Sequence, residues 1–436
     1  MKPTPSFGPL LGCIFLAAGS LAAAQGQKQE APTDWIDPAT GHRVIRLSPP
    51  GGGSSLYFHQ NTYTPEGDKL IFNSRGAIVA VDLTTLGTKP PRVEVIVQGA
   101  SAIAMARKTR EVYFFKGGGK GGALHAAHVD TKAVREVKHA RGGTINADET
   151  LSVIARPATD PTGKTPAPAP RKLLPQRERM FGDKLKKNIP LTPEEEASAA
   201  KEQRLAARLA NPTSQAFTFT NLKTGGAKTV GHAYAWLNHL QFSPTDPTLL
   251  LFCHEGTWHE VDRIWAIRAD GSDRKLIHKR NLDMEIAGHE FWGHDGKTIW
   301  FDLQTPRGQQ FWLAGVNVET GAKNRYPIER DHWSIHYNVS RDGKRFAGDG
   351  GDPGQVAFAK DGRWIYLFTP EAGTLKKGSD GWSEGTLKVE RLVSMAKHNY
   401  KTEPNVTLTP DGKWVVFRSN MHGPTHVYAA EVKKSN

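Results

Sequence analysis

The sequence is poor in cysteine and, beyond its first 25 residues, has no long apolar run. Two of the 436 residues are Cys, Cys13 and Cys253, which excludes a small fold held together by several disulfides. No run of 18 or more apolar residues follows the start of the chain, and this excludes an integral membrane protein built from helices. A Gly-x-Ser-x-Gly elbow is also lacking, so no α/β-hydrolase domain is expected.

The first residues are typical of an export signal. Lys2 provides the positive start, an apolar stretch runs from Leu10 to Ala23, and small residues precede a cleavage site before Gln25. We therefore expect a signal peptide over residues 1–24 and a periplasmic or secreted protein. Cleavage would leave Cys253 as the remaining thiol, and its apolar surroundings predict a core position.

Acidic residues are in the minority. There are 57 Lys and Arg against 44 Asp and Glu, a formal net charge of +13. Such a charge attracts acidic partners, whether nucleic acid, an anionic surface or a polyuronate. An exported chain without a nucleic-acid-binding motif favours an acidic oligosaccharide as the partner, with no nucleic acid and no membrane insertion.

A unit of turn and strand recurs along the chain at a spacing of roughly 50 residues, which is typical of propeller blades. Turn triplets such as Pro410-Asp411-Gly412 separate runs rich in β-branched and aromatic residues. Seven copies begin, in order, at Gln60, Ala102, Gly142, His239, His289, His336 and Asn405. The sequence therefore predicts an all-β fold, a single seven-bladed β-propeller over residues 25–436.

Two segments stand outside this repeat. The strand-like segment Thr40–Leu47 precedes the first full blade, and we expect it to pair with the last blade and close the ring. Residues 157–212 are rich in Pro and Lys and then in Glu, Ala and Arg, with Thr192 and Pro193 typical of a helix start. They predict a partly helical insertion in the third blade, either a solvated flap or a lid.

The residue that opens each copy belongs to the innermost strand, so the seven residues should line the central channel at one height. We call them the axial positions. Three are His, one is Gln and one is Asn. Imidazoles together with oxygen donors suit a divalent metal, and a His outside the metal shell could accept a proton near neutral pH. Further His side chains are expected near the same face, namely His59, His254, His259 and His398.

Several segments resemble the oligogalacturonate lyases, a seven-bladed propeller family that cleaves short pectic oligouronides by β-elimination. The most specific are Cys253-His254-Glu255-Gly256 and His289-Glu290-Phe291-Trp292, and Asp262-Arg263-Ile264-Trp265 also matches. The resemblance implies a divalent metal, Mn²⁺ in the family, with His289 as a ligand.

The sequence departs from that family before the last inner strand, where the family's other ligands come from a Gln-x-x-His-Pro-His run. Here the run reads Tyr400-Lys401-Thr402-Glu403-Pro404-Asn405. Glu403 and Asn405 can still donate oxygen, and His398 lies close by in sequence, so the expected metal ligands are His289, His398, Glu403 and Asn405.

The implied mechanism assigns the remaining residues. Arg263 would hold the sugar carboxylate, with a surface salt bridge to Asp262 as the equally weighted alternative. His239 is the expected base, with His254 and His259 as alternatives. Expected to contact substrate are Gln60, His59, His259 and His336.

Two other functions stay open at this point. One is a non-catalytic propeller similar to the TolB-type periplasmic scaffolds, which would not require His at three axial positions. The other is a glycan-binding or hydrolytic propeller, which would need two acidic residues facing one pocket. The acidic residues available for it are Glu255, Glu290, Asp349 and Glu403.

Overall fold

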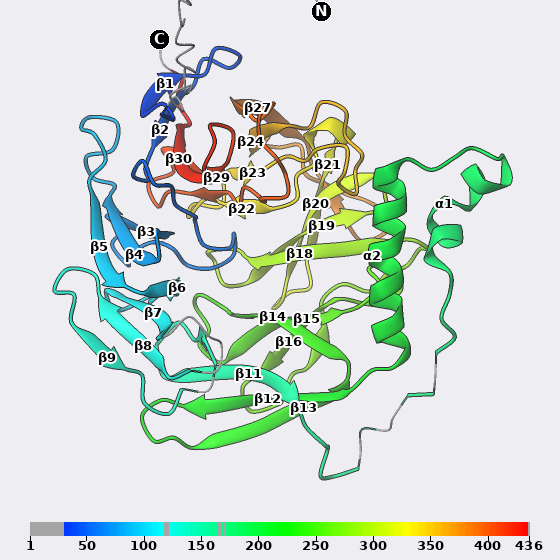
Figure 1. Ribbon diagram of the computed structural model, residues 1–436. Coiled ribbons are helices and arrows are strands. Elements are labelled where there is room, and N and C mark those ends of the chain that lie inside the picture. The colour runs from blue at the N-terminus through cyan, green and yellow to red at the C-terminus, as the bar shows by residue number, and fades with distance from the viewer. Residues whose placement is uncertain are drawn as a thin grey trace, which may run out of the picture.

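The computed structural model describes residues 30–116, 122–140, 142–163, 165, 168–169 and 171–434. The expected signal peptide lies outside these residues. Figure 1 looks down on seven β-sheets arranged around a central axis. The seven-bladed β-propeller expected from the repeat is confirmed. None of the helices in the described part of the chain is long and apolar enough to span a membrane.

The first three blades follow the chain in order. Blade 1 contains β3 (Lys69–Ser74), β4 (Ala77–Asp82) and β5 (Val93–Gln98). Blade 2 contains β6 (Ala100–Met105), β7 (Glu111–Lys116), β8 (Leu124–His128) and β9 (Val134–Glu136). Blade 3 contains β10 (Thr144–Ile145), β11 (Leu151–Pro157), β12 (Ser214–Asn221) and β13 (Ala227–Tyr234).

Blades 4 and 5 have four strands each, and two short strands extend blade 5. Blade 4 contains β14 (Trp236–Phe242), β15 (Leu249–Glu255), β16 (Ile264–Arg268) and β17 (Lys275–Leu276). Blade 5 contains β18 (Ile286–Trp292), β19 (Thr298–Gln304), β20 (Phe311–Asn317), β21 (Lys323–Ile328), β25 (Lys376–Lys377) and β26 (Ser383–Glu384).

The last two blades return to the N-terminal segment. Blade 6 contains β22 (Tyr337–Val339), β23 (Phe346–Gly348), β24 (Trp364–Pro370) and β27 (Leu387–Ser394), preceded by the 3₁₀ helix Arg330–His332. Blade 7 contains β28 (Thr407–Leu408), β29 (Trp414–Ser419), β30 (His426–Glu431), β2 (Arg43–Arg46) and β1 (Asp34–Ile36).

Blade 7 joins the two ends of the described chain. Strand β2 pairs antiparallel with β30, with Val44 opposite Ala430 and Ile45 opposite Ala429. Val44 is fully buried in this sheet. The expected closure of the ring by Thr40–Leu47 is therefore confirmed, and it covers the edge that β30 would otherwise expose.

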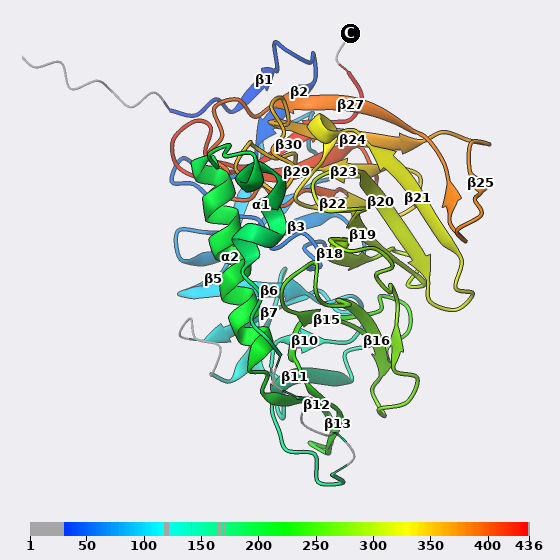
Figure 2. The same ribbon diagram turned by 90° about the vertical axis from the view of Figure 1, so that its right-hand side faces the viewer.

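The insertion leaves and re-enters blade 3 between two paired strands, β11 and β12. It carries α1 (Gln176–Lys186) and α2 (Pro193–Ala210). Thr192 caps α2 as expected, because its hydroxyl accepts from the Glu195 N–H while the Glu195 carboxylate accepts from the Thr192 N–H. Both helices lie on one face of the propeller, the face toward the viewer in Figure 1 and on the left side of Figure 2.

Apolar side chains fill the space between neighbouring blades. Ile299, Phe301 and Leu303 alternate along β19 and share one buried cluster with Leu251 and Ile264 of blade 4, as period-2 patterning predicts. Cys253 is a fully buried free thiol, so its expected core position is confirmed.

Polar side chains join the innermost strands of adjacent blades. The Asn338 side-chain oxygen accepts from the Leu408 N–H at 3.0 Å, and the Gln241 amide donates to the Glu290 carbonyl at 2.8 Å. These bonds fix the relative height of the inner strands, and with it the height of the axial positions.

Candidate functional site

Several axial positions have an unusual backbone. His239, His289 and Asn405 have φ values of 51°, 50° and 54°, and Gly142 has 98°. The pairing register shifts at two of them, between Asn238 and Gln241 in blade 4 and between Gly288 and Phe291 in blade 5. Such bulges redirect a side chain out of the normal alternation of a strand, often beside a functional site.

The three axial histidines lie together around the aromatic pair Tyr57 and Phe58. The His289 and His336 rings are 4.9 Å apart between centroids. Tyr57 lies 5.2 Å from His336 and 6.3 Å from His239. The structure brings His239, His289 and His336 together around Tyr57, as expected. We call these three the histidine cluster.

His239 lies between two carboxylates. Its Nε2 is 3.7 Å from Glu255 Oε2 and its Nδ1 is 3.7 Å from Glu290 Oε1. The His239 side chain is 22% exposed, whereas Glu290 is fully buried and neither of its carboxylate oxygens has a hydrogen-bond partner among the described residues. An accessible imidazole flanked by two carboxylates is placed to act as an acid or base on a group in the channel.

Arg263 fixes the position of the Glu255 carboxylate beside His239. Its guanidinium donates to Glu255 Oε1 at 2.6 Å, is stacked over the Trp258 ring at 4.4 Å and is almost fully buried. Burial raises the pKa of Glu255, but the charge of Arg263 outweighs this and lowers the pKa below its ordinary value. Glu255 is therefore an anion beside His239.

This position corrects both readings of Arg263. The guanidinium is 2% exposed and packed between Glu255 and Trp258, which leaves it little surface for a sugar carboxylate. It also forms no surface salt bridge with Asp262. Asp262 instead accepts a hydrogen bond from the Arg280 N–H at 3.0 Å. Arg263 is a positioning residue that holds Glu255.

His336 is oriented by Asp349. Its Nδ1 is 2.8 Å from Asp349 Oδ2, and the same carboxylate accepts from the backbone N–H of His336 and of Asn405. Because Asp349 can only accept, Nδ1 carries the proton and Nε2 presents its lone pair. That Nε2 has no hydrogen-bond partner among the described residues and lies 3.8 Å from Glu403 Oε2.

His289 is held as a neutral imidazole. It packs 5.0 Å from the Trp258 ring, and its Nδ1 has no hydrogen-bond partner in the described part of the chain. Burial, followed by the proximity of His336, lowers the pKa of His289 well below its ordinary value.

The four expected metal ligands do not fit as one set. His289 and Glu403 keep free donor atoms at the cluster. Asn405 uses its side-chain oxygen to accept from the Phe58 N–H and its amide to donate to the Glu403 carbonyl. His398 is bonded at both ring nitrogens, to the Ser419 hydroxyl and the Thr402 carbonyl. Among the described residues, no three His, Cys, Asp or Glu side chains converge so that they could hold a metal ion.

The structure separates the two alternative bases from the cluster. His254 follows Cys253 and precedes Glu255 on β15, so its side chain points to the opposite face of the strand from Glu255. Burial, and then Arg171, lowers the pKa of His254 to about 4. His259 is buried, with Nε2 2.8 Å from Gln176 Oε1 and Nδ1 3.3 Å from Arg307, so it anchors the insertion.

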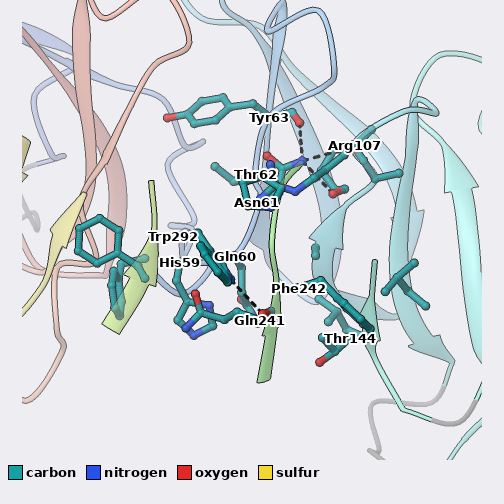
Figure 3. A pocket seen from close by; sticks show the side chains of 18 of the residues that line it. His59, Gln60, Asn61, Thr62, Tyr63, Arg107, Thr144, Gln241, Phe242 and Trp292 are labelled. Carbon is teal, nitrogen blue, oxygen red and sulfur yellow. Dashed lines mark hydrogen bonds between the residues drawn. The ribbon is translucent and has the colours of Figure 1, made fainter. Parts of the chain in front are cut away.

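The other two residues expected at the substrate lie at the channel. The His59 ring is 6.2 Å from the His239 ring, and burial followed by His239 lowers the pKa of His59 to about 3. The Gln60 side-chain oxygen accepts from the Tyr57 N–H at 3.1 Å. Both residues line a pocket of about 160 Å³ that continues along the channel (Figure 3).

The insertion packs against the blades that carry the histidine cluster. Glu202 of α2 forms a buried ion pair with Arg307 at 2.9 Å, and its carboxylate accepts from the Trp258 N–H. On the same helix, the ammonium of Lys201 lies 5.7 Å from the Trp258 ring. The insertion therefore lies beside the site and contributes a cation to it.

Sequence reasoning missed several of these residues. Glu255 and Glu290 were considered only as glycosidase acids near different blades, yet both reach His239. Glu290 directly follows an axial position, and the bulge at that position became visible only in the structure. Tyr57 and Phe58 precede the first repeat copy, so the periodicity gave no indication of them.

Comparison with known proteins identifies the family. A model of the oligogalacturonate lyase family matches residues 206–436, which is more than half of the chain. The chain belongs to this family. An oligogalacturonate lyase of Dickeya dadantii (strain 3937) is 30% identical over 241 residues, and an oligogalacturonide lyase of Pectobacterium atrosepticum is 28% identical over the same length. Each match covers 51% of this chain and 58% of the relative, so it spans little more than half of those proteins.

Solved structures of oligogalacturonate lyases share the fold over nearly the whole chain. One, described as in complex with manganese, superposes with a TM-score of 0.65 and 20% identity, covering 92% of this chain and 96% of the other. An oligogalacturonate lyase from Vibrio parahaemolyticus gives a TM-score of 0.66 with the same identity and coverage.

Proposed function

We propose that this protein is an exported lyase that cleaves oligogalacturonides, or related oligosaccharides containing uronate, by β-elimination to 4,5-unsaturated products. The observation that carries the proposal is His239, accessible at the channel mouth between the carboxylates of Glu255 and Glu290. Family membership makes a uronate the expected substrate, and the net charge of +13 favours an acidic one.

His239 acts as the base. It removes the proton from C5 of the sugar, next to the carboxylate, and the electron pair forms the C4–C5 double bond while the C4–O4 bond breaks. The departing O4 oxygen takes a proton from water. Glu255 and Glu290 compensate the imidazolium that forms, and Arg263 keeps Glu255 in place, so little reorganisation accompanies the proton transfer.

Lys201 holds the sugar carboxylate. Its ammonium is exposed, has no ion-pair partner among the described residues and lies over Trp258, whose ring contacts both His289 and Arg263. Pairing with this cation holds the carboxylate of the bound sugar in place. The Trp258 and Tyr57 rings provide apolar faces for the sugar.

His336 and His289 pack behind His239 rather than removing the proton. His336 is fully buried, with its Nδ1 proton committed to Asp349 and its Nε2 facing Glu403, so the expected contact between His336 and substrate is not available in this structure. His289 is kept neutral and does not repel the protonated His239. A divalent cation, as in the manganese complex of the related lyase, would need donors other than His398 and Asn405.

Substitution of the base tests the proposal. In His239→Ala we expect the rate of cleavage to fall at least about a hundredfold, because general-base catalysis contributes typically 10²–10⁴-fold. The measurement is the ultraviolet absorbance of the unsaturated product formed from trigalacturonate, with and without Mn²⁺. His128→Ala, at an outer strand of blade 2, is the matched control and should retain wild-type activity.

Two results would count against the proposal. Unchanged activity in His239→Ala would remove His239 as the base. No absorbance change from the wild-type protein with any oligouronide, with or without metal, would favour the non-catalytic propeller instead.

A further inference from the structure

A second repeat position carries basic residues. Five residues after each axial position, at the other end of the inner strand, the seven blades have Pro65, Arg107, Ala147, Pro244, His294, Arg341 and Pro410. Three of the seven are basic and none is acidic. The innermost strands run along the central channel, and their axial positions carry the histidine cluster at one end. The residues five positions later therefore surround the other end of the channel, which we call the far mouth.

The three basic groups lie close enough to influence one another. Burial, followed by the charge of Arg341, lowers the pKa of Arg107 to about 10. His294 is exposed to solvent at the mouth yet has protein on most sides. This partial burial, followed by Arg107 and Arg341, lowers the pKa of His294 to about 4.

The described residues provide no counter-charge for Arg107, whereas Arg341 lines a separate hollow together with Glu66, Asp68 and Asp411. Within the described residues, Arg107 and Arg341 form no ion pair and no side-chain hydrogen bond. The acidic residues nearby are committed to other partners. Glu66 and Asp68 pair with Arg110, Glu149 accepts from Lys108 and Thr109, and Asp411 accepts from Thr409 and Lys413. A half-buried guanidinium without a counter-charge is costly, so an anion from solution would be stabilised there.

The channel provides room for such an anion. Arg107 and His294 line the pocket of about 160 Å³ at one end, and His59 and Gln60 line it at the other. Figure 3 shows Arg107 with Tyr63 and Asn61 at the upper end of the view, away from His59 and Gln60. A buried water needs only about 10–15 Å³ of such space, so the pocket has room for a molecule of the size of one sugar acid.

We propose that the far mouth is a binding site for a small organic acid, whose carboxylate is held by Arg107 beside His294 in the pocket that both residues line. Guanidinium groups suit this ligand because their planar N–H pairs match the two oxygens of a carboxylate. The site is distinct from the histidine cluster and does not depend on the proposed lyase activity.

The His294 imidazole reports on binding. Its ring signals are followed by NMR in protein labelled at histidine, assigned with His294→Gln, while the pH is lowered from neutral. The probes are monomeric galacturonate, which has no glycosidic bond to cleave, and inorganic phosphate, each compared with NaCl at equal ionic strength. We expect galacturonate to raise the pKa of His294 by about one unit, since an opposite charge within about 4–6 Å favours the protonated form.

Two variants show where the probe binds. Arg107→Met keeps most of the side-chain volume but removes the cation, and the shift caused by galacturonate should disappear. Lys108→Met, which removes the adjacent exposed cation, should leave the shift intact. No shift with galacturonate, a shift with phosphate alone, or an undiminished shift in Arg107→Met would each overturn the proposal.

Discussion

At the scale of single residues, the site depends on backbone conformations that few side chains adopt. His239, His289 and Asn405 have positive φ values, which are uncommon outside glycine although Asn and His tolerate them better than most residues. Each such conformation costs on the order of 1–3 kcal/mol and persists because the surrounding sheet imposes it. The bonds from Gln241 to Glu290 and from Asn338 to Leu408 are part of that frame.

Replacing Glu403 and Asn405 by the two histidines of the family's Gln-x-x-His-Pro-His run tests whether these positions can hold a metal ion. In the double variant Glu403→His with Asn405→His, we expect the affinity for Mn²⁺ to rise at least about tenfold. In the wild type, Asn405 would have to give up two hydrogen bonds of about 1 kcal/mol each to reach a metal, and about 1.4 kcal/mol corresponds to tenfold. Isothermal titration calorimetry measures the affinity.

Asn405→Ala is the control for that experiment, because it removes the same two hydrogen bonds without adding a ligand. It should not bind Mn²⁺ more tightly than the wild type. Equal affinity in the wild type and the double variant would show that the present residues already form the better site.

The sequence predicted the residues of the site unevenly, for a physical reason. The repeat locates any residue that occupies the same place in each blade, so His239, His289 and His336 could be found without coordinates. Arg263 could not be placed, because its burial depends on Trp258 and Glu255 from other parts of blade 4. His398 and Asn405 were assigned as ligands by resemblance, whereas local hydrogen bonds occupy their donor atoms.

At the scale of elements, α2 is the part of the insertion that bears on function. Ala199, Glu202, Ala206 and Leu209 form its buried face, and Arg208 lies over Trp236 at 4.3 Å. The helix itself was predictable from Thr192, Pro193 and the acidic residues of its first turn. Its docking was not, because the Glu202–Arg307 ion pair joins segments more than 100 residues apart and leaves no local pattern.

Removal of the α2 cation tests the role of the helix. In Lys201→Met we expect the KM for oligogalacturonate to rise about tenfold with kcat changed much less, because a hydrogen bond to a charged group is worth about 1.5–3 kcal/mol. Steady-state kinetics by product absorbance separates the two constants. Lys223→Met, in the exposed turn between β12 and β13, should leave both unchanged, and an unchanged KM in Lys201→Met would remove Lys201 from the site.

At the scale of the whole molecule, stability depends on the closure of blade 7. Val44 is fully buried in β2, opposite Ala430 of β30. Val44→Ala should lower the free energy of unfolding by about 2 kcal/mol, since each buried methylene contributes about 0.8 kcal/mol and the cavity adds to the loss. Urea denaturation measures this.

Ile36→Ala in β1 is the matched control for Val44→Ala, because the Ile36 side chain is 48% exposed. It should change the unfolding free energy by less than about 0.5 kcal/mol. Equal effects of the two substitutions would show that the seam formed by β2 and β30 contributes no more than an ordinary surface strand.

The pairing of β2 with β30 also determines when the ring of blades can close during synthesis. Of the strands that the structure describes, β2 is among the first to be synthesised and β30 comes last, so β2 must wait for its partner while six blades are made between them. Until then its backbone presents an open edge to which another chain could add. A contact between such distant segments forms slowly, and we therefore expect nascent chains to be most prone to aggregation just before the ring closes.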